Sequence, residues 1–239
     1  MNRPPIRLRY FDARGRAQFM RAYLTVRGID FDDDRVPLDE GFASWRALRD
    51  DRLQTGPLKR LPVLHYGDEL IPETYVIAGF AHRQFGDFDA LDAPDRLHHD
   101  VLVSCACIDL MLPTAMLIWA DAMMPRVDLG AYAQGTLGRM QRTLDVLDES
   151  LRDWGWVGNM SKRPVTVADC MLWEEIDKAT ALLGSHLGLD ARPELEAFYR
   201  DHPAREQFLG LLAANPCQIT GRPGEAAAIT AIQQSLAPA

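Results

Sequence analysis

The amino-acid sequence predicts an α/β plus all-α fold, with a small mixed α/β domain followed by an all-helical domain. Three observations support this prediction. Strand and helix patterns alternate in the order βαβαββα over residues 1–84, an acidic segment without periodicity follows, and every later pattern is helical. Strands joined by a helix run parallel and strands joined by a tight turn run antiparallel, so this order requires a mixed sheet. We expect an α/β domain over 1–84, a linker over 85–94, a helical domain over 95–214 and a tail over 215–239.

The first elements follow from hydrophobic periodicity. Residues 6–10 alternate between outward and inward positions, as a strand does, and apolar residues recur at helical spacing over 14–27 until Gly28 ends the pattern. Up to residue 60, the sequence further predicts a strand over 29–36 that is charged on one face, a helix over 39–48 capped by Asp39, and a long irregular loop over 49–60.

The segment 61–64 (LPVL) is the most informative part of this domain. Pro62 opens a short strand, and proline in a sheet is confined to edges, strand starts and special turns. X-Pro is also the common place for a cis peptide bond. A Gly67-Asp68 turn and a second strand over 69–71 follow. A helix then begins at residues 72–74 and runs to about residue 84, with its free N–H groups available to a carboxylate. A strand with unused hydrogen bonds beside such a helix start suits a small peptide ligand.

The rest of the chain is expected to be helical. Pro113 lies inside a long helical pattern over 95–124 and should kink it. Residues 166–169 (TVAD) are a variant of the capping box and begin an apolar helix. The other expected helices cover 128–152, 193–201 and 203–214, and a possible short helix in the tail ends near residue 236.

Composition limits the possible partners. The net charge of −8 argues against nucleic acid and anionic membranes. We see neither a signal peptide nor an apolar run of membrane-spanning length. Only four cysteines occur, which fits reduced thiols and a cytoplasmic location. Cys105 and Cys107 point in different directions on a helix, so we assign them no redox role.

Three motifs carry a resemblance to a known family. The segment 8–17 (LRYFDARGRA), the segment 61–64 with Glu73-Thr74, and the capping box over 166–169 occur in this order. Together they resemble the cytosolic glutathione S-transferase superfamily, of the tyrosine type and closest to the sigma class. The resemblance covers residues 6–214. It implies a thioredoxin-like N-terminal domain that binds glutathione and a helical domain that forms the pocket for an electrophile.

The chemistry of glutathione gives Tyr10 a role. A thiol with a reference pKa of about 8.5 is mostly protonated at neutral pH, yet the thiolate is the nucleophile. Tyr10 ends the first strand, where its hydroxyl could donate a hydrogen bond to the sulfur. Residues 1–43 contain neither Ser nor Cys, which excludes the serine and cysteine types. Arg16 is the second catalytic candidate, through its positive charge. Alternatively, Tyr10 could simply pack against the core, and Arg16 could be a solvated arginine on the surface of the helix.

The resemblance implies a set of glutathione contacts. The backbone of Val63, with Leu61 and Pro62 before it, would pair with the cysteinyl part of glutathione as an added strand. Glu73 and Thr74 would hold the γ-glutamyl end, although Thr74 could equally be a simple helix cap. Trp45, Arg49 and Arg60 are expected to hold the glycyl carboxylate. The resemblance also implies a homodimer, in which Asp109 of the neighbouring subunit would contact glutathione.

A small hydrophobic electrophile is expected where the helical domain faces Tyr10. Methionine-rich walls adapt to varied apolar ligands, although each methionine could be ordinary core. The candidate pocket residues are Phe11, Ala13, Met111, Leu112, Met116 and Trp119.

Conjugation of glutathione to such an electrophile, as in detoxification, is the expected activity. The alternatives are a glutathione-dependent isomerase or ether-cleaving enzyme, and a non-catalytic glutathione- or ligand-binding protein of the kind that became lens crystallins. Glutathione is expected as a substrate. We expect no metal, and we interpret His98-His99-Asp100 as a surface group.

Overall fold

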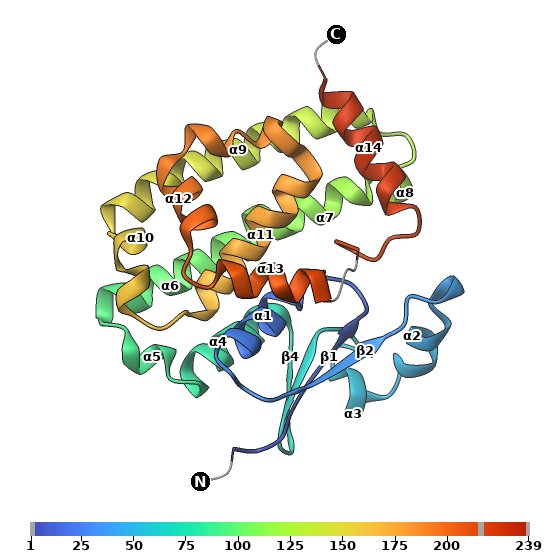
Figure 1. Ribbon diagram of the computed structural model, residues 1–239. Coiled ribbons are helices and arrows are strands. Elements are labelled where there is room, and N and C mark those ends of the chain that lie inside the picture. The colour runs from blue at the N-terminus through green and yellow to red at the C-terminus, as the bar shows by residue number, and fades with distance from the viewer. Residues whose placement is uncertain (1–2, 215–217, 238–239) are drawn as a thin grey trace.

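A computed structural model describes residues 3–214 and 218–237. Two layers follow one another along the chain (Figure 1). A four-stranded sheet and its helices occupy the N-terminal part, and the later helices pack above it. This arrangement confirms the predicted fold class, a thioredoxin-like domain followed by an all-helical one.

The sheet has the mixed topology that the sequence predicts. Its strands are β1 (Ile6–Phe11), β2 (Asp32–Val36), β3 (Val63–Tyr66) and β4 (Glu69–Pro72), in the order β2-β1-β3-β4. β1 pairs with β2 in parallel, and β3 pairs with both β1 and β4 in antiparallel orientation. Val63 therefore lies opposite Arg9 on one side and Pro72 on the other. This register brings the end of β1, the start of β3 and the end of β4 to the same edge of the sheet.

Two helices connect the sheet to the helical domain. α1 (Gln18–Val26) and α4 (Thr74–Gln84) both contact α11 (Val167–Leu183), the long apolar helix at the centre of the C-terminal part. Figure 1 shows α2 (Ala43–Leu48) and α3 (Arg52–Thr55) apart from the helical domain. The segment 49–60, which the sequence predicts as an irregular loop, contains the one-turn helix α3. Asp51 caps it by accepting a hydrogen bond from the Leu53 N–H at 2.9 Å.

Shorter and longer helices complete the fold. In the part of the chain that the structure describes, they are η1 (Glu40–Phe42), α5 (Asp87–Ala90), α6 (Ala93–Cys105), η2 (Ala106–Met111), α7 (Leu112–Ile118), α8 (Ala120–Met123), α9 (Leu129–Asp153), α10 (Trp156–Asn159), η3 (Met160–Lys162), η4 (Gly184–Leu187), η5 (Leu189–Ala191), α12 (Pro193–Asp201), α13 (Arg205–Ala214) and α14 (Glu225–Leu236). α5 lies within the predicted linker. Residues 215–217 and 238–239 of the predicted tail, and residues 1–2, lie outside the described residues.

The long helical pattern predicted over 95–124 is interrupted rather than simply bent. α6 passes through the π-helical segment η2 into α7, and Pro113 is the second residue of α7. Proline has no N–H and its ring crowds the preceding turn, which favours a wider turn just before it.

The expectation that the chain has no apolar run of membrane-spanning length was wrong. The run Ala93–Ile118 contains an 18-residue window that is long and apolar enough to cross a membrane. Half of that window is buried in the protein, and α6 and η2 pack on α11. A core helix of a globular domain has the same composition.

The capping box predicted at residues 166–169 is present. The Thr166 hydroxyl accepts a hydrogen bond from the Asp169 N–H, and the Asp169 carboxylate accepts one from the Thr166 N–H at 2.8 Å. Asp169 also accepts hydrogen bonds from Trp156 and Arg163. Although burial alone would raise the pKa of Asp169, the Arg163 guanidinium lowers it below its usual range. Asp169 is a structural residue of the helical domain, as the sequence predicts.

Candidate active site

Tyr10 lies at the junction of the two domains. The alternation along β1 turns its side chain into the protein, where 7% of it is exposed. The chain then turns sharply at Gly15, whose φ is +42°. A Cβ placed on Gly15 would lie 2.4 Å from the Tyr10 hydroxyl oxygen, so the backbone of this turn passes directly beside the hydroxyl. A residue with a side chain could not take this position without displacing Tyr10.

The Tyr10 side chain contributes to a cavity of about 470 Å³ between the domains. Half of its lining residues come from the segment 111–123, which contains η2, α7 and α8, and the other half come from the 10–16 segment, α11 and the C-terminal tail. The lining residues are Tyr10, Gly15, Arg16, Met111, Leu112, Thr114, Ala115, Met116, Trp119, Met123, Glu175, Lys178, Ile219 and Thr220. This volume suits a small organic molecule.

Four of the six candidate pocket residues, Met111, Leu112, Met116 and Trp119, line this cavity, and Arg16 does so as well. Phe11 and Ala13 do not. Phe11 packs edge-on against both Tyr10 and Trp45, with ring centroids 5.4 Å apart in each pair, and its ring stays outside the cavity lining. Ala13 is fully buried, and its carbonyl accepts a hydrogen bond from Arg21 at 2.7 Å.

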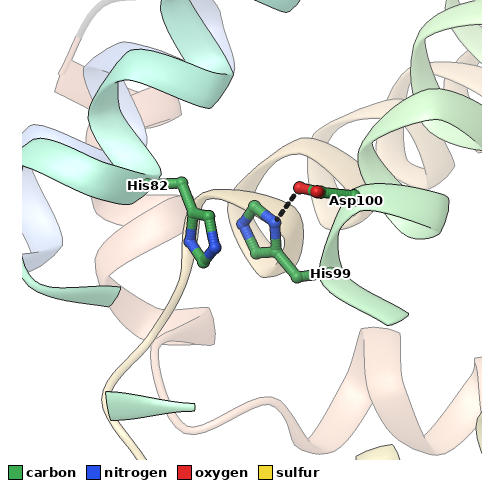
Figure 2. A group of neighbouring side chains, drawn as sticks. All are labelled: His82, His99 and Asp100. Carbon is green, nitrogen blue, oxygen red and sulfur yellow. Dashed lines mark hydrogen bonds and ion pairs between the residues drawn. The ribbon is translucent and has the colours of Figure 1, made fainter. Parts of the chain in front are cut away.

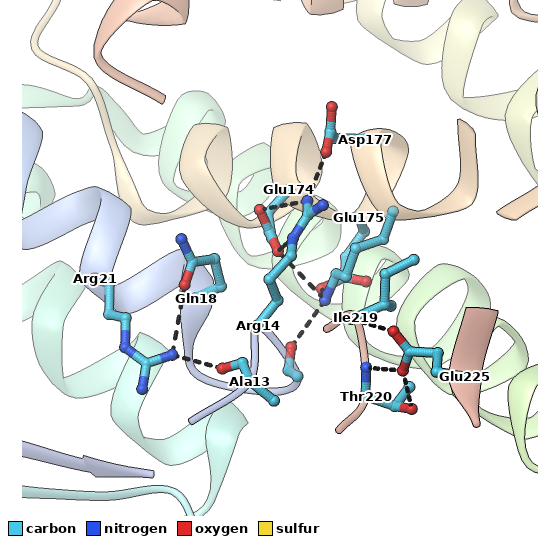
Figure 3. Close-up of polar contacts among 12 residues, drawn as sticks. Ala13, Arg14, Gln18, Arg21, Glu174, Glu175, Asp177, Ile219, Thr220 and Glu225 are labelled. Atoms are coloured by element: carbon cyan, nitrogen blue, oxygen red, sulfur yellow. Dashed lines mark hydrogen bonds and ion pairs between the residues drawn. The ribbon is translucent and has the colours of Figure 1, made fainter. Parts of the chain in front are cut away.

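The turn that follows Tyr10 is tied to the helical domain by buried charges (Figure 3). Arg14 donates to both carboxylate oxygens of Glu174, at 2.9 and 3.0 Å, and to Asp177 at 2.6 Å. Burial disfavours the charged guanidinium, but the two carboxylates more than offset it and raise the pKa of Arg14. The Lys178 ammonium donates to the Gly15 carbonyl at 2.8 Å and to Glu175 Oε1 at 2.5 Å.

The C-terminal tail forms part of the same site. The Arg14 and Gly15 N–H groups donate to the carbonyls of Gln218 and Ile219, at 2.9 and 2.7 Å. Glu225, the first residue of α14, accepts hydrogen bonds from the N–H groups of Ile219 and Thr220 and from the Thr220 hydroxyl (Figure 3). The tail, which the family resemblance does not cover, therefore supplies one wall of the Tyr10 cavity.

The predicted glutathione-binding segment lies at the sheet edge next to Tyr10. The Leu61–Pro62 peptide bond is cis. Glu73 has φ +70° and ψ 132°, an uncommon conformation for a residue with a side chain. Its Oε1 atom is buried without a hydrogen-bond partner among the described residues. Thr74 is the first residue of α4, and no side chain caps this helix.

At the start of α4, Glu73 therefore leaves one carboxylate oxygen unpaired among the described residues. Thr74 is not a helix cap in this structure, because Glu73 occupies that position. The lining of the Tyr10 cavity does not include Val63, Glu73 or Thr74. The structure thus brings these residues to the same sheet edge as Tyr10 but not into the same cavity.

The candidate residues for the glycyl carboxylate lie on the outer loops. Arg49 is exposed and lies 3.5 Å from Asp50, and Arg60 is exposed as well. Both are fixed to Thr55 through the backbone: the Thr55 hydroxyl donates to the Arg49 carbonyl, and the Arg60 N–H donates to the Thr55 carbonyl. Trp45 is half-buried against Phe11, and Leu61 is half-buried at the start of the motif.

Asp109 lies on a different surface. It is exposed on η2 and lines a groove between α6 and α9, together with Val101, Arg139 and Val146. It does not line the Tyr10 cavity of its own chain.

The prediction of a surface group was wrong for His99, whereas Asp100 is exposed. His99 is buried and stacks on His82, with ring centroids 3.7 Å apart and planes inclined by 15°, while Asp100 lies beside them (Figure 2). His82 from α4 was not a candidate. Ligand lone pairs lie in the plane of the imidazole ring, so two parallel stacked rings do not direct nitrogens at one ion. Burial, with the His99 charge second, lowers the pKa of His82 to about 4, so this ring is neutral at pH 7.

No protein-family model matches the chain. Among curated proteins, the chain is 32% identical over 80 residues to a probable glutathione S-transferase 8 of Caenorhabditis elegans, which is 34% of this chain and 35% of that protein. It is 29% identical over 103 residues to S-crystallin 2 of Octopus vulgaris, over 43% and 44% of the two chains. The matched part therefore spans well under half the length of these relatives.

Solved structures match over a much larger part of the chain. A Pi-class glutathione S-transferase of Onchocerca volvulus has a TM-score of 0.71 at 22% identity, covering 91% of this chain and 99% of that one. A sigma-class enzyme of Fasciola hepatica has 0.67 at 20% identity, covering 92% and 100%. A glutathione S-transferase of Necator americanus, described as monomeric, has 0.68 at 21% identity, covering 87% and 97%.

The chain therefore has the fold of the cytosolic glutathione S-transferase superfamily. The resemblance inferred from its motifs is confirmed at this level.

Proposed function

We propose that this protein is a glutathione S-transferase that conjugates glutathione to a small, mostly apolar electrophile. The observation that carries the proposal is the Tyr10 side chain, which lines a largely apolar interdomain cavity beside the edge of the sheet that presents Val63, Glu73 and Thr74. Sequence matches to proteins named glutathione S-transferases support it.

Glutathione would bind along that edge. The free carboxylate oxygen of Glu73 is suited to the ammonium of the γ-glutamyl group, and the N–H groups in the first turn of α4, which no side chain caps, are suited to its carboxylate. Because Val63 already pairs with Arg9 and Pro72, the cysteinyl part would lie against the backbone just before β3, at Leu61 and Pro62, and the thiol would then reach Tyr10. Trp45, Arg49 and Arg60 are proposed for the glycyl end.

Tyr10 would then stabilise the thiolate. Its hydroxyl donates a hydrogen bond to the sulfur anion and lowers the thiol pKa, while Arg16 adds positive charge at the cavity wall. The sulfur electron pair attacks the electrophilic carbon, and the leaving group departs with the bonding pair. Met111, Leu112, Met116 and Trp119 would hold the apolar body of the electrophile.

Replacement of Tyr10 by Phe tests this role. Loss of one hydrogen bond to the anion typically costs about 2–4 kcal/mol, so turnover should fall roughly 30- to 1000-fold. Ultraviolet titration of bound glutathione should show the thiol pKa rising by about one unit or more. Tyr132→Phe is the matched control, because Tyr132 lies on α9 and outside the cavity lining. An unchanged thiol pKa in Tyr10→Phe would remove Tyr10 from the mechanism.

We also propose a homodimer. Leu97, Val101 and Ile108 of α6 and η2 and Val146 of α9 are all exposed. Val101 and Val146 line the groove that contains Asp109. A second copy would cover these apolar side chains and bring Asp109 toward the neighbouring glutathione site. Sedimentation should give a dimer, and Asp109→Ala should weaken glutathione binding several-fold. A 26.8 kDa monomer with full glutathione affinity would contradict both points.

Two other functions use the same scaffold. An isomerase or ether-cleaving enzyme would need the same thiolate, and a panel of aryl halides, epoxides and enones assayed for product type separates these reactions. Matches to S-crystallins favour testing a non-catalytic role as well. In that case glutathione or a ligand would bind without turnover. We include a cytoplasmic location and independence from metals in the transferase proposal.

A further inference from the structure

Two buried charged residues interrupt the apolar wall of the Tyr10 cavity. Glu175 and Lys178 lie one turn apart on α11, are 1% and 2% exposed, and both contribute to the lining. A buried charge is costly unless every polar atom finds a partner.

Lys178 is well supplied with partners. Its ammonium donates to the Gly15 carbonyl at 2.8 Å and to Glu175 Oε1 at 2.5 Å, and it lies 3.8 Å from Glu174 Oε1. The position of Oε1 is thereby fixed, because an ammonium needs an acceptor.

Glu175 is not fully supplied. Its second oxygen, Oε2, is buried and has no hydrogen-bond partner among the residues that the structure describes. The Thr114 hydroxyl, on the α7 side of the same lining, is buried without a partner as well. Two polar atoms thus lack partners in the lining of one largely apolar cavity.

Neighbouring charges do not fill this position. Arg14 is committed to Glu174 and Asp177. Burial, partly offset by Lys178 and reinforced by Glu174, raises the pKa of Glu175 to about 7. Cys107 of η2 also faces this charge, and burial followed by the Glu175 charge raises the pKa of its thiol to about 12. In its ionised form, Glu175 therefore lacks a donor at Oε2 among the described residues.

We propose that Glu175 Oε2 binds the second substrate, which is an apolar electrophile that carries a hydroxyl or N–H donor. Lys178 is the positioning residue that turns Oε2 toward the ligand. The identification of this ligand as the electrophile rests on the proposed transferase function, whereas the donor preference of the cavity does not.

The proposal makes an unusual prediction for Glu175→Gln. Lys178 requires an acceptor at the Oε1 position, so the amide oxygen will face Lys178 and the NH₂ group will take the place of Oε2. An acceptor then becomes a donor at the same point in the cavity. The ligand preference should reverse rather than merely weaken.

Binding of two unreactive ligands tests this directly. The probes are a saturated aryl alkyl ketone with a hydroxymethyl group on the ring and its methyl ether, which has lost the donor. Calorimetry at pH 8 should show the wild-type protein binding the alcohol about tenfold more tightly than the ether, the factor expected for one hydrogen bond to a charged group. Glu175→Gln should prefer the ether. Glu175→Met should bind the two alike, and it remains informative if the Gln variant does not fold.

Glu206→Gln is the matched control, because Glu206 is exposed on α13, and it should keep the wild-type preference. Equal binding of the two probes by the wild type, or the same preference in all variants, would overturn the proposal. Because the probes do not react, a protein that prefers the alcohol but conjugates nothing would disprove the transferase function and leave the donor site standing.

Discussion

Asp169→Ala should strongly destabilise the helical domain. The side chain is 1% exposed, and its two oxygens accept hydrogen bonds from the Thr166 N–H and hydroxyl, from Trp156 Nε1 and from Arg163. The substitution removes the cap of α11 and leaves the Arg163 guanidinium, which is 8% exposed, without its carboxylate.

The expected cost can be worked from these contacts. Loss of a helix cap costs about 1 kcal/mol, and breaking a buried ion pair by removing one partner costs about 3–5 kcal/mol. The two effects overlap, so we expect a loss of about 4 kcal/mol in the free energy of unfolding. This is a large fraction of the roughly 5–15 kcal/mol that stabilises a typical protein.

Urea unfolding followed by circular dichroism measures this loss. Asp128→Ala is the matched control, because Asp128 caps α9 from the exposed surface with one hydrogen bond to the Ala131 N–H at 3.0 Å. It should cost only about 1 kcal/mol. If Asp169→Ala costs no more than Asp128→Ala, the buried network does not contribute as argued.

The pH dependence gives a second check. The pKa of Asp169 is lower in the folded protein than its ordinary value of 3.8. Its contribution is therefore present above about pH 4 and is lost as the pH falls through the folded pKa. The difference between wild type and Asp169→Ala should shrink on acidification below pH 4, and a constant difference would contradict the assignment.

Two further predictions concern the walls of the cavity. The pKa of Glu175 is raised from 4.5 to about 7, so the folded protein holds this proton more tightly than the unfolded chain does. The resulting contribution to the free energy of unfolding is lost as the pH rises between these values. The stability of Glu175→Gln relative to wild type should therefore increase by about 3 kcal/mol between pH 4 and pH 8, as measured by urea titration at each pH; no change would show that the carboxyl titrates normally. Glu225→Ala removes the acceptor for the Ile219 and Thr220 N–H groups, and hydrogen exchange at these two amides should accelerate at least tenfold while exchange in α9 stays unchanged. Equal protection in the variant would mean that Glu225 does not hold the tail.

Local sequence patterns determined much of this protein. The order of strands and helices, the strand that begins after Pro62, the helix start at Glu73-Thr74 and the cap at Asp169 all depend on neighbours within a few residues. Such signals are readable because backbone geometry and capping are short-range effects. α3 escaped prediction since a four-residue helix has no periodicity to detect.

Only the tertiary structure decided how the site is enclosed. Arg14 meets Glu174 and Lys178 meets Gly15 across some 160 residues of chain, and no local pattern specifies such a pairing. One signal was available: Glu174, Glu175 and Lys178 lie within the apolar helix α11, and charges there require partners. The positions of the C-terminal tail and of Phe11 depend on long-range packing as well. Residues 219 and 220 line the Tyr10 cavity and Phe11 packs against Trp45 outside its lining, because long-range packing, and not the sequence nearby, places a side chain in a cavity.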